Sequence, residues 1–221
     1  MSQTITLVTF FHFQEQGIEK LRQFQALAAP LFLKHHLAID KEFVPSGQGQ
    51  IGAAPNGRER PDLVQIASFP ALENLRAYLA DPEVAALAPI RASGLRRMTA
   101  SFGPTVELGE TSHPAAMGSV HFLALATFAK PDGLEELVAF NRIGIESGLF
   151  SKYGLRVPHL AKVAKTVTPI GTDDGPAPQA LVHFTVAEPA RMKDYLADPA
   201  YTELAPLRDG ALSSYHFFQG T

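Results

Sequence analysis

The pentapeptide Tyr-Leu-Ala-Asp-Pro occurs twice in this chain, at residues 78–82 and 195–199. The pattern Leu-Ala-Pro-x-Arg follows each copy at the same distance, at residues 87–91 and 204–208. Both matches are displaced by 117 residues, the difference between 195 and 78. Long-period self-similarity of this kind decides the architecture of a chain. The sequence therefore predicts an internal duplication.

The match extends over most of the 221 residues. Gly-Ile-Glu-x-Leu at 17–21 resembles Gly-Leu-Glu-x-Leu at 133–137, with small changes of offset that indicate insertions in loops. We expect two repeats, at residues 1–103 and 119–221. The stretch between them, residues 104–118, is rich in Pro, Gly, Ser and Thr and has no sustained period, which is typical of a linker.

Each repeat has the pattern of a ferredoxin-like unit. In the first repeat, residues 5–13 alternate between two largely apolar faces, as in a strand covered on both sides. A helical spacing of apolar residues follows, and further strands are expected at 38–44, 63–69 and 96–102, with a second helix after Pro70. The order β-α-β-β-α-β is the split βαβ motif. Helices then cover one face of each sheet, so the other face must be buried, and two repeats achieve this by packing sheet against sheet.

Asp81-Pro82 and Asp198-Pro199 are typical of an Asp N-cap with Pro at the first helical position. The duplicated Arg91 and Arg208 allow two interpretations, a structural ion pair or an anion site. Capping explains the Asp and the Pro without a ligand, so the structural interpretation is favoured.

The segment Leu-Val-Gln-Ile-Ala-Ser-Phe-Pro at 63–70 and the duplicated pentapeptide stretch carry a family resemblance. Each half resembles the ferredoxin-like families that assemble as dimeric α+β barrels, in particular a small bacterial family of unknown function, here in tandem. The resemblance implies an α+β fold in which both repeats form an intramolecular dimeric α+β barrel. The wider superfamily includes cofactor-free monooxygenases, isomerases, cyclases and haem enzymes, and also proteins without known activity. Fold alone does not choose among them.

Composition excludes several classes of function. Apolar residues make up 46% and charged residues 19%, and the net charge is −3, without the basic excess of a nucleic-acid-binding protein. The absence of cysteine excludes disulfides, thiolate metal sites and a cysteine nucleophile. No uncharged apolar run reaches the roughly 18 residues of a membrane helix, and no targeting signal is apparent. The family resemblance implies a bacterial protein. We expect it to be cytoplasmic, with a small molecule as its partner and with homodimerisation left open.

Gly47-x-Gly49-x-x-Gly52 matches the dinucleotide-binding fingerprint. That fingerprint requires a helix directly after it, whereas residues 53–57 have the composition of another turn. A hairpin loop is the favoured interpretation. The related families usually have Glu-Gly after a Gly-rich turn in this region, and this sequence does not.

Histidines on predicted strands are the main candidates for catalytic and ligand-binding residues. The second repeat has His183, Tyr215 and His216 where the first has apolar or smaller residues, and we predict that these three form the catalytic group of a cavity. His121 and His12 are expected to contribute to ligand binding. The alternative is that all of these are hydrogen-bonded core histidines. No metal motif is present, so neither a metal nor another cofactor is expected.

Two functions remain open. The first is a cofactor-independent enzyme acting on a small aromatic or polyketide-like molecule. The second is a non-catalytic small-molecule-binding or scaffold protein whose barrel interior is filled by its 15 phenylalanines.

Overall fold

The computed structural model describes residues 3–52, 58–109, 118–173 and 175–221. The chain forms two compact units, and neither is a continuous stretch of sequence. The first unit consists of Met1–Val44, Pro61–Thr105 and Val163–Gly175. The second unit consists of Pro45–Arg60, Val106–Lys162 and Pro176–Thr221.

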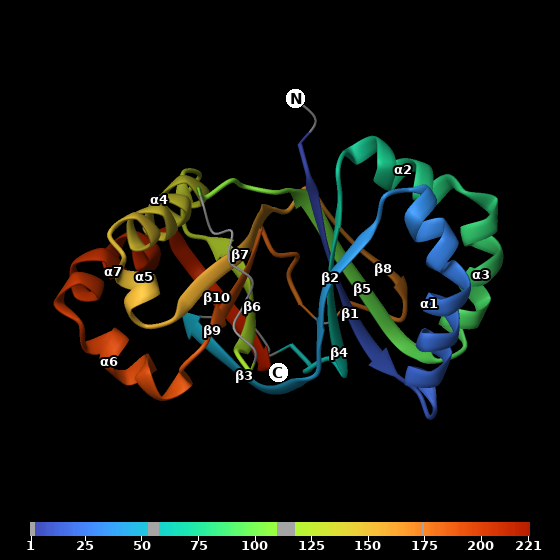
Figure 1. Cartoon of the computed structure of the whole chain (residues 1–221), viewed down its shortest axis with the longest axis horizontal. Helices are drawn as coiled ribbons and strands as arrows, with labels where there is room; N and C mark the ends of the chain where they lie inside the picture. Colours follow the sequence, from blue (N-terminus) through green and yellow to red (C-terminus); the bar gives the residue numbers. More distant parts are fainter. Residues whose placement is uncertain (1–2, 53–57, 110–117, 174) are drawn as a thin grey trace. The chain divides into compact units, whose positions relative to one another are not determined.

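The first unit is an antiparallel five-stranded sheet with three helices on one face (Figure 1). Its strand order is β2-β4-β1-β5-β8. The strands are β1 (Ile5–Phe13), β2 (Ala38–Phe43), β4 (Leu63–Phe69), β5 (Leu95–Pro104) and β8 (Lys165–Ile170). The helices are α1 (Gly17–Lys34), α2 (Leu72–Ala80) and α3 (Pro82–Ala92).

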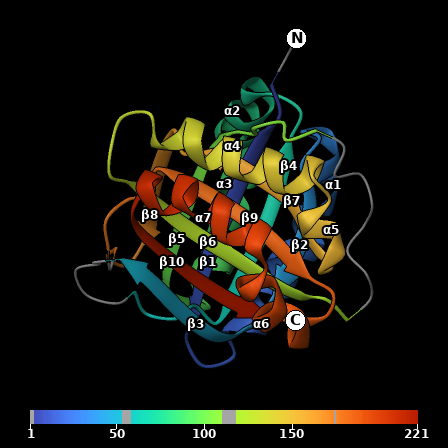
Figure 2. The same cartoon turned by 90° about the vertical axis from the view of Figure 1, so that its left-hand side faces the viewer.

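The second unit repeats this arrangement, with strand order β3-β10-β6-β9-β7. In Figure 2 its helices α4 and α7 lie side by side across the sheet. The strands are β3 (Pro45–Gly52), β6 (Val120–Phe128), β7 (Leu155–Lys162), β9 (Ala180–Val186) and β10 (Leu212–Gly220). The helices are α4 (Gly133–Glu146), α5 (Leu149–Lys152), α6 (Met192–Ala197) and α7 (Pro199–Ala211), with a 3₁₀ turn at Pro189–Arg191. The predicted α+β fold with a ferredoxin-like sheet in each half is confirmed.

One strand of each sheet comes from the other sequence repeat. β3, from the first repeat, pairs with β10, and β8, from the second repeat, pairs with β5. The Gly-rich stretch at 47–52, interpreted above as a hairpin loop, is therefore a strand, and that interpretation was wrong. Residues 53–57, which follow it, and residues 110–117 of the expected linker lie outside the described residues.

Glycines in β3 permit close contact with large side chains of β10. A Cβ on Gly49 would clash with Cζ of the Phe217 ring, and a Cβ on Gly47 would lie 2.6 Å from the Gln219 amide nitrogen. Small residues are needed where another chain segment approaches so closely. The composition that suggested a loop thus reflects packing.

The Asp-Pro dipeptides form the predicted helix caps. The Asp81 carboxylate accepts a hydrogen bond from the Glu83 backbone N–H at 2.9 Å, and Asp198 accepts one from the Ala200 N–H at 2.8 Å. Both carboxylates also bind a lysine from a preceding helix, Lys34 or Lys152. Among the described residues, no helix is long and apolar enough to span a membrane.

Candidate functional site

Tyr215 and His216, neighbours on β10, point to opposite faces of their sheet. Tyr215 lines a cavity beneath the helices of the second unit. His216 is buried on the other face, where its ring lies 4.8 Å from that of Phe218. Successive side chains of a strand alternate between faces, so these two cannot share a pocket. The expected grouping of both with His183 does not form.

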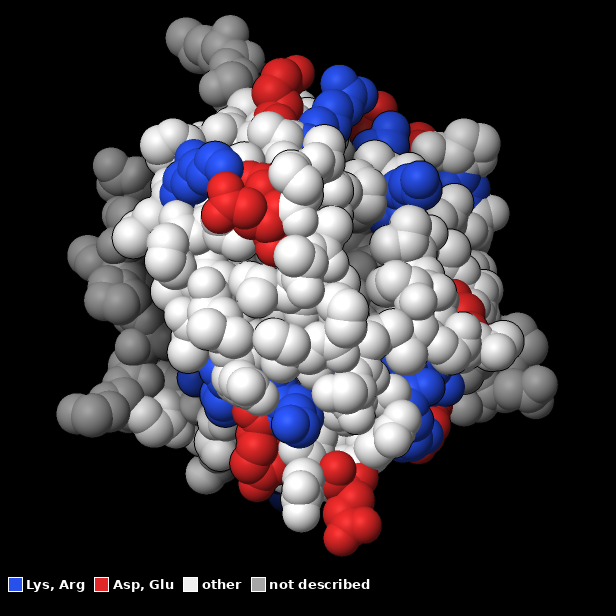
Figure 3. Space-filling view, turned by 90° about the vertical axis from the view of Figure 1, so that its right-hand side faces the viewer, with Lys and Arg blue, Asp and Glu red and all other residues white. Residues whose placement is uncertain are grey.

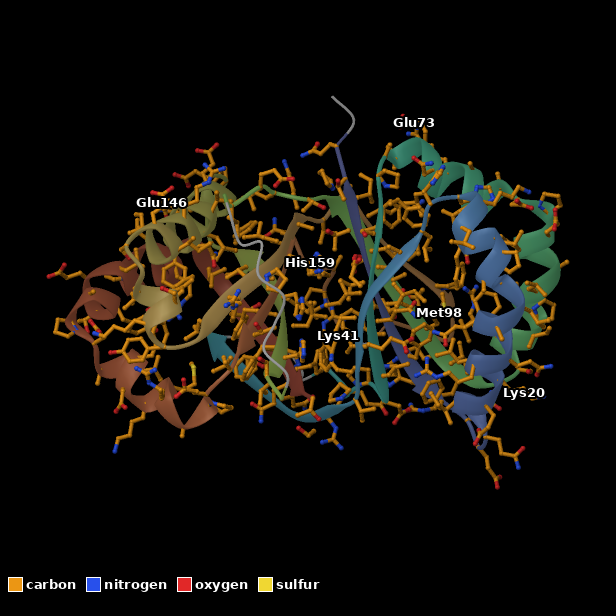
Figure 4. All side chains as sticks on the ribbon, viewed as in Figure 1. Lys20, Lys41, Glu73, Met98, Glu146 and His159 are labelled. Carbon is orange, nitrogen blue, oxygen red and sulfur yellow. The ribbon has the colours of Figure 1, made fainter. Side chains whose placement is uncertain are left out.

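His183 belongs to a row of histidines on the face of the sheet away from the helices. Its Nε2 lies 3.0 Å from Nδ1 of His121, and their rings stack at 5.3 Å. On its other side His183 stacks on His159 at 5.4 Å. His159, labelled in Figure 4, lies on β7. The structure thus brings His183 and His121 together, but away from Tyr215.

His12 belongs to the first unit. It lies on β1, is buried, and accepts a hydrogen bond at Nε2 from Arg97 at 2.7 Å. Within the described ranges, no group of three or more His, Asp or Glu residues has the geometry to hold a metal ion.

The cavity of the second unit has a volume of about 240 Å³ and lies between the sheet and helices α4 to α7. This volume is just below the ~300 Å³ at which the usual range for ligand pockets begins, so it suits a small ligand. Phe122 and Phe184 stack face to face at 4.7 Å within its wall. The phenylalanines that line it are Phe122, Phe140, Phe150, Phe184 and Phe217. These five phenylalanines therefore line a space without filling it.

Three phenols interrupt the apolar wall. The rings of Tyr195 and Tyr201 lie 4.6 Å apart, and Tyr215 faces the same cavity from β10. Burial raises the pKa of Tyr215 above its usual value, against a smaller opposing influence of Arg208. Burial, and then the neighbouring Tyr201, raise the pKa of Tyr195 as well. Both hydroxyls are therefore protonated at neutral pH and can donate hydrogen bonds.

Arg208 and Asn141 complete the polar part of the lining. The Arg208 guanidinium lies 5.5 Å from the centre of the Phe140 ring and 5.6 Å from that of Tyr201. It also donates to Asp209 at 2.7 and 2.9 Å, so the structural ion pair expected for this arginine is present. The Asn141 amide nitrogen donates to the Leu137 carbonyl at 2.7 Å, which leaves the amide oxygen as the acceptor that this side chain can offer.

Sequence reasoning missed Tyr195, Tyr201, Asn141 and Arg208 as members of one site. The offset of 117 contained a usable signal, because it places Tyr201 opposite Val84, just as it places Tyr215 opposite Met98. Two apolar positions of the first repeat have thus become phenols in the second, and both line the cavity.

The size of this cavity does not fit haem, and of the side chains that hold haem iron only tyrosine and methionine are among its described lining residues. In many haem proteins a histidine holds the iron, and none of the described lining residues is a histidine. A volume of about 240 Å³ is also small for a macrocycle.

Comparison with known proteins gives a likeness of fold. No protein-family model matches the sequence, and no curated protein does. A candidate monooxygenase from Lactobacillus acidophilus NCFM matches at 12% identity and a TM-score of 0.59, covering 100% of this chain and 94% of its own. An anthrone oxidase-like protein matches at 11% identity and a TM-score of 0.57, covering 100% and 92%.

A mutant chlorite dismutase from Candidatus Nitrospira defluvii matches at 9% identity and a TM-score of 0.53, again over 100% and 92% of the two chains. At such identities the likeness concerns architecture alone. This chain therefore has the duplicated α+β fold that these three proteins share, while membership of the small bacterial family suggested by its motifs stays a prediction.

Proposed function

We propose that the cavity of the second unit binds a small aromatic molecule carrying a hydroxyl or carbonyl group, and that the protein oxidises this molecule with O₂ without a bound cofactor. The observation that carries the proposal is the convergence of Tyr195, Tyr201 and Tyr215 on a cavity whose other walls are mainly phenylalanine and aliphatic side chains. Phenylalanine walls favour a flat ring, and a few placed donors fix its orientation.

The chemistry needs little from the protein beyond binding and charge stabilisation. An enolisable ring CH₂ gives up a proton to solvent water, and the resulting enolate is electron-rich enough to react with O₂ directly. The carbon ends as C=O with one oxygen atom from O₂, and the other oxygen atom leaves as water, so no reductant is required. The protonated phenols and the Arg208 charge would stabilise the enolate oxygen. The fold shared with an anthrone oxidase-like protein and a candidate monooxygenase supports this reaction class.

One observation favours a second candidate, a binding protein without catalysis. Among the described residues that line the cavity, none is His, Asp or Glu. The cavity therefore offers no side chain that commonly serves as a general base at neutral pH. If the ligand does not enolise by itself, the site would hold it unchanged.

The two candidates are separated by measuring binding and oxygen uptake together. Anthrone and 1-naphthol are added to the full chain, and the melting temperature and the methyl NMR signal of Met192, which lines this cavity, are recorded. Oxygen uptake above the protein-free rate supports the oxidase, and binding without uptake supports the binding protein. If neither compound shifts the melting temperature or the Met192 signal, both candidates fail.

Tyr215→Phe provides the variant and Tyr153→Phe its matched control. Both remove a buried phenol hydroxyl in the same unit, but Tyr153 lies outside the cavity lining. Loss of one hydrogen bond to the ligand should weaken binding by about 5- to 10-fold for Tyr215→Phe. Tyr153→Phe should leave the ligand-induced shift unchanged relative to its own unliganded melting temperature.

A further inference from the structure

The first unit contains a cavity of its own, about 210 Å³ in volume, between its helices and its sheet. Met98, labelled in Figure 4, lies in its lining between the sheet and α1. Figure 3 views this unit from the helix side, where uncharged side chains form a broad central area and charged ones gather toward the rim. The walls are again mainly aliphatic and phenylalanine side chains, among them Phe11, Phe24, Phe32 and Phe102.

Arg91 is the one charged side chain in the described lining of this cavity. Its guanidinium lies 5.0 Å from the centre of the Phe24 ring. Its Nε is buried and has no hydrogen-bond acceptor among the described residues. Burial lowers the pKa of Arg91, with only Tyr78 opposing, so the charge is held at a desolvation cost. Arg91 as a whole is half-buried, and a cation that is partly desolvated in this way is stabilised by an anionic partner.

The second unit contains the carboxylate partner that Arg91 lacks among the described residues of the first unit. Arg208 occupies the equivalent position and is bonded by the carboxylate of the next residue, Asp209. The residue after Arg91 is Ala92, which has no carboxylate. As far as the structure describes the chain, the equivalent arginine is thus paired with a carboxylate in the second repeat and not in the first.

The carboxylate that contacts two lining residues of this cavity, Glu42, already has hydrogen-bond partners. Glu42 accepts hydrogen bonds from the amides of Gln25 and Gln65, at 2.6 and 2.8 Å, and from Arg22. Although burial would raise the pKa of Glu42, these bonds lower it overall, so its charge is balanced by Arg22. The two glutamines are lining residues, and Glu42 holds them in place.

We infer that the cavity of the first unit binds a small aromatic monocarboxylate, whose carboxylate pairs with Arg91 and whose ring lies among the phenylalanines. A guanidinium presents a planar fork that matches a carboxylate in two parallel hydrogen bonds. The apolar wall accepts the ring. A dianion such as phosphate would bring more charge than one arginine balances, and the walls would not solvate it.

The probe is benzoate, with benzamide as its neutral analogue of nearly the same shape. The chain has four methionines, of which only Met98 and Met192 are described, and they line the first and the second cavity respectively. Methyl NMR titration of the full chain should show benzoate shifting the Met98 signal and not the Met192 signal. Because hydrogen bonds to charged groups stabilise strongly, benzamide should bind 10- to 100-fold more weakly.

Two variants test the role of Arg91 independently. Arg91→Gln should weaken benzoate binding 10- to 100-fold and leave benzamide binding nearly unchanged. Ala92→Asp should also weaken benzoate binding 10- to 100-fold and leave benzamide binding nearly unchanged, because it supplies the carboxylate that Asp209 supplies in the second unit. Ala86→Asp is the matched control, since it adds the same charge at an exposed position of α3, and it should keep benzoate affinity within about 2-fold.

Several outcomes would overturn the inference. The inference fails if benzoate and benzamide bind with equal affinity, or if 10 mM benzoate does not shift the Met98 signal. It also fails if inorganic phosphate binds as tightly as benzoate. A benzoate response unchanged in Ala92→Asp would overturn it even if Arg91→Gln failed to fold. Because the readout is Met98, failure here is distinguishable from failure of the proposed function, whose readout is Met192.

Discussion

The two cavities of this protein occupy equivalent places in equivalent units, yet three substitutions give them different chemistry. Val84 and Met98 of the first repeat correspond to Tyr201 and Tyr215 of the second, and Ala92 corresponds to Asp209. Among the described residues, the arginine of the first cavity has no carboxylate partner, whereas the second cavity has a paired arginine and additional phenols. The duplicated backbone thus supplies a similar cavity in each unit, and a few residues in or beside each lining decide what the cavity accepts.

The helix caps show the opposite behaviour. Lys34 and His35 bind Asp81 at 2.8 and 2.7 Å, and their equivalents Lys152 and Tyr153 both bind Asp198 at 2.7 Å. The second donor differs between the repeats, His35 in one and Tyr153 in the other, but the carboxylate has a hydrogen-bond partner at this place in both. The helix caps have kept their role in both repeats, whereas a few positions in or beside the cavity linings have changed.

The largest expected effect comes from separating the repeats. Residues 1–103 alone lack β8, which pairs with β5, and contain β3 without its partner β10. Unpaired strand edges favour association. We expect this fragment to give no folded monomer in sedimentation velocity, but aggregates or a dimer that exchanges β3.

Mixing the two fragments tests the exchange of strands independently. Fragments 1–103 and 104–221 each contain the strand that completes the other's sheet, so together they should form a 1:1 complex. A stable, well-folded monomer of residues 1–103 would contradict the exchange of strands.

The next largest effect is expected at the two glycines with which the equivalent helices α1 and α4 begin. A Cβ on Gly17 would fall well inside contact distance of the Gly94 carbonyl and 2.7 Å from the Phe13 Cβ. A Cβ on Gly133 would lie 2.7 Å from the Ala211 carbonyl and 2.8 Å from the Phe128 Cβ. Overpacking of this kind costs about 1–3 kcal/mol. In chemical denaturation, Gly17→Ala should lower the free energy of unfolding more than Gly133→Ala.

Gly210→Ala is the control for this pair. Gly210 lies inside α7, and a Cβ there meets nothing within 4 Å. The substitution should raise the free energy of unfolding by about 0.5–1 kcal/mol, because alanine loses less backbone entropy in a helix. If Gly17→Ala were as harmless as Gly210→Ala, the close packing at the start of α1 would be wrong.

The sequence predicted the parts of the fold that depend on local pattern. Alternation in residues 5–13 and the Asp-Pro dipeptides correspond to β1 and to the caps of α3 and α7. The exchange of β3 and β8 was not predictable in this way, because the glycines at 47 and 49 resemble a loop in composition. Their role appears only beside the side chains of β10 that they accommodate.

The candidate site was predictable only in part. The alternation in 181–186 correctly separated His183 from the helix-facing residues, and the repeat alignment singled out Tyr215. Placing Tyr215 and His216 in one site was wrong, because neighbouring residues of a strand face opposite ways. The polar cavity residues that were missed, Asn141, Tyr195, Tyr201 and Arg208, lie on helices. Their convergence with β10 therefore depends on tertiary packing that no local pattern encodes.

A smaller effect is expected from Asp209→Ala, which converts the paired arginine of the second unit into an unpaired one. Benzoate should then also shift the Met192 signal, with an affinity about 10-fold above that of the unmodified second cavity. Methyl NMR titration measures this, with the Met98 response as internal reference. Asp132→Ala, which removes an exposed carboxylate of the same unit, should not create the response. If Asp209→Ala leaves Met192 unresponsive, pairing of the arginine does not explain the difference between the cavities.

The smallest effect concerns acid stability at the cap of α7. Lys152, then Tyr153, and the Ala200 N–H lower the pKa of Asp198 to about 2, from an ordinary value of 3.8. A carboxyl group whose pKa is lower in the folded state stabilises the fold above its ordinary pKa, and this stabilisation is lost as the pH falls through the folded value. At pH 7, Asp198→Asn should lower the melting temperature by about 2–4 °C, because the cap loses its charged contacts. The difference from the unmodified chain should shrink as the pH falls from 4 to 2, as measured by calorimetry.

Asp132→Asn is the matched control, since Asp132 is also an N-cap but makes no capping hydrogen bond through its side chain, and it should change the melting temperature by less than about 1 °C across this range. A difference for Asp198→Asn that stays constant down to pH 2 would show that the carboxylate charge is not what stabilises this cap.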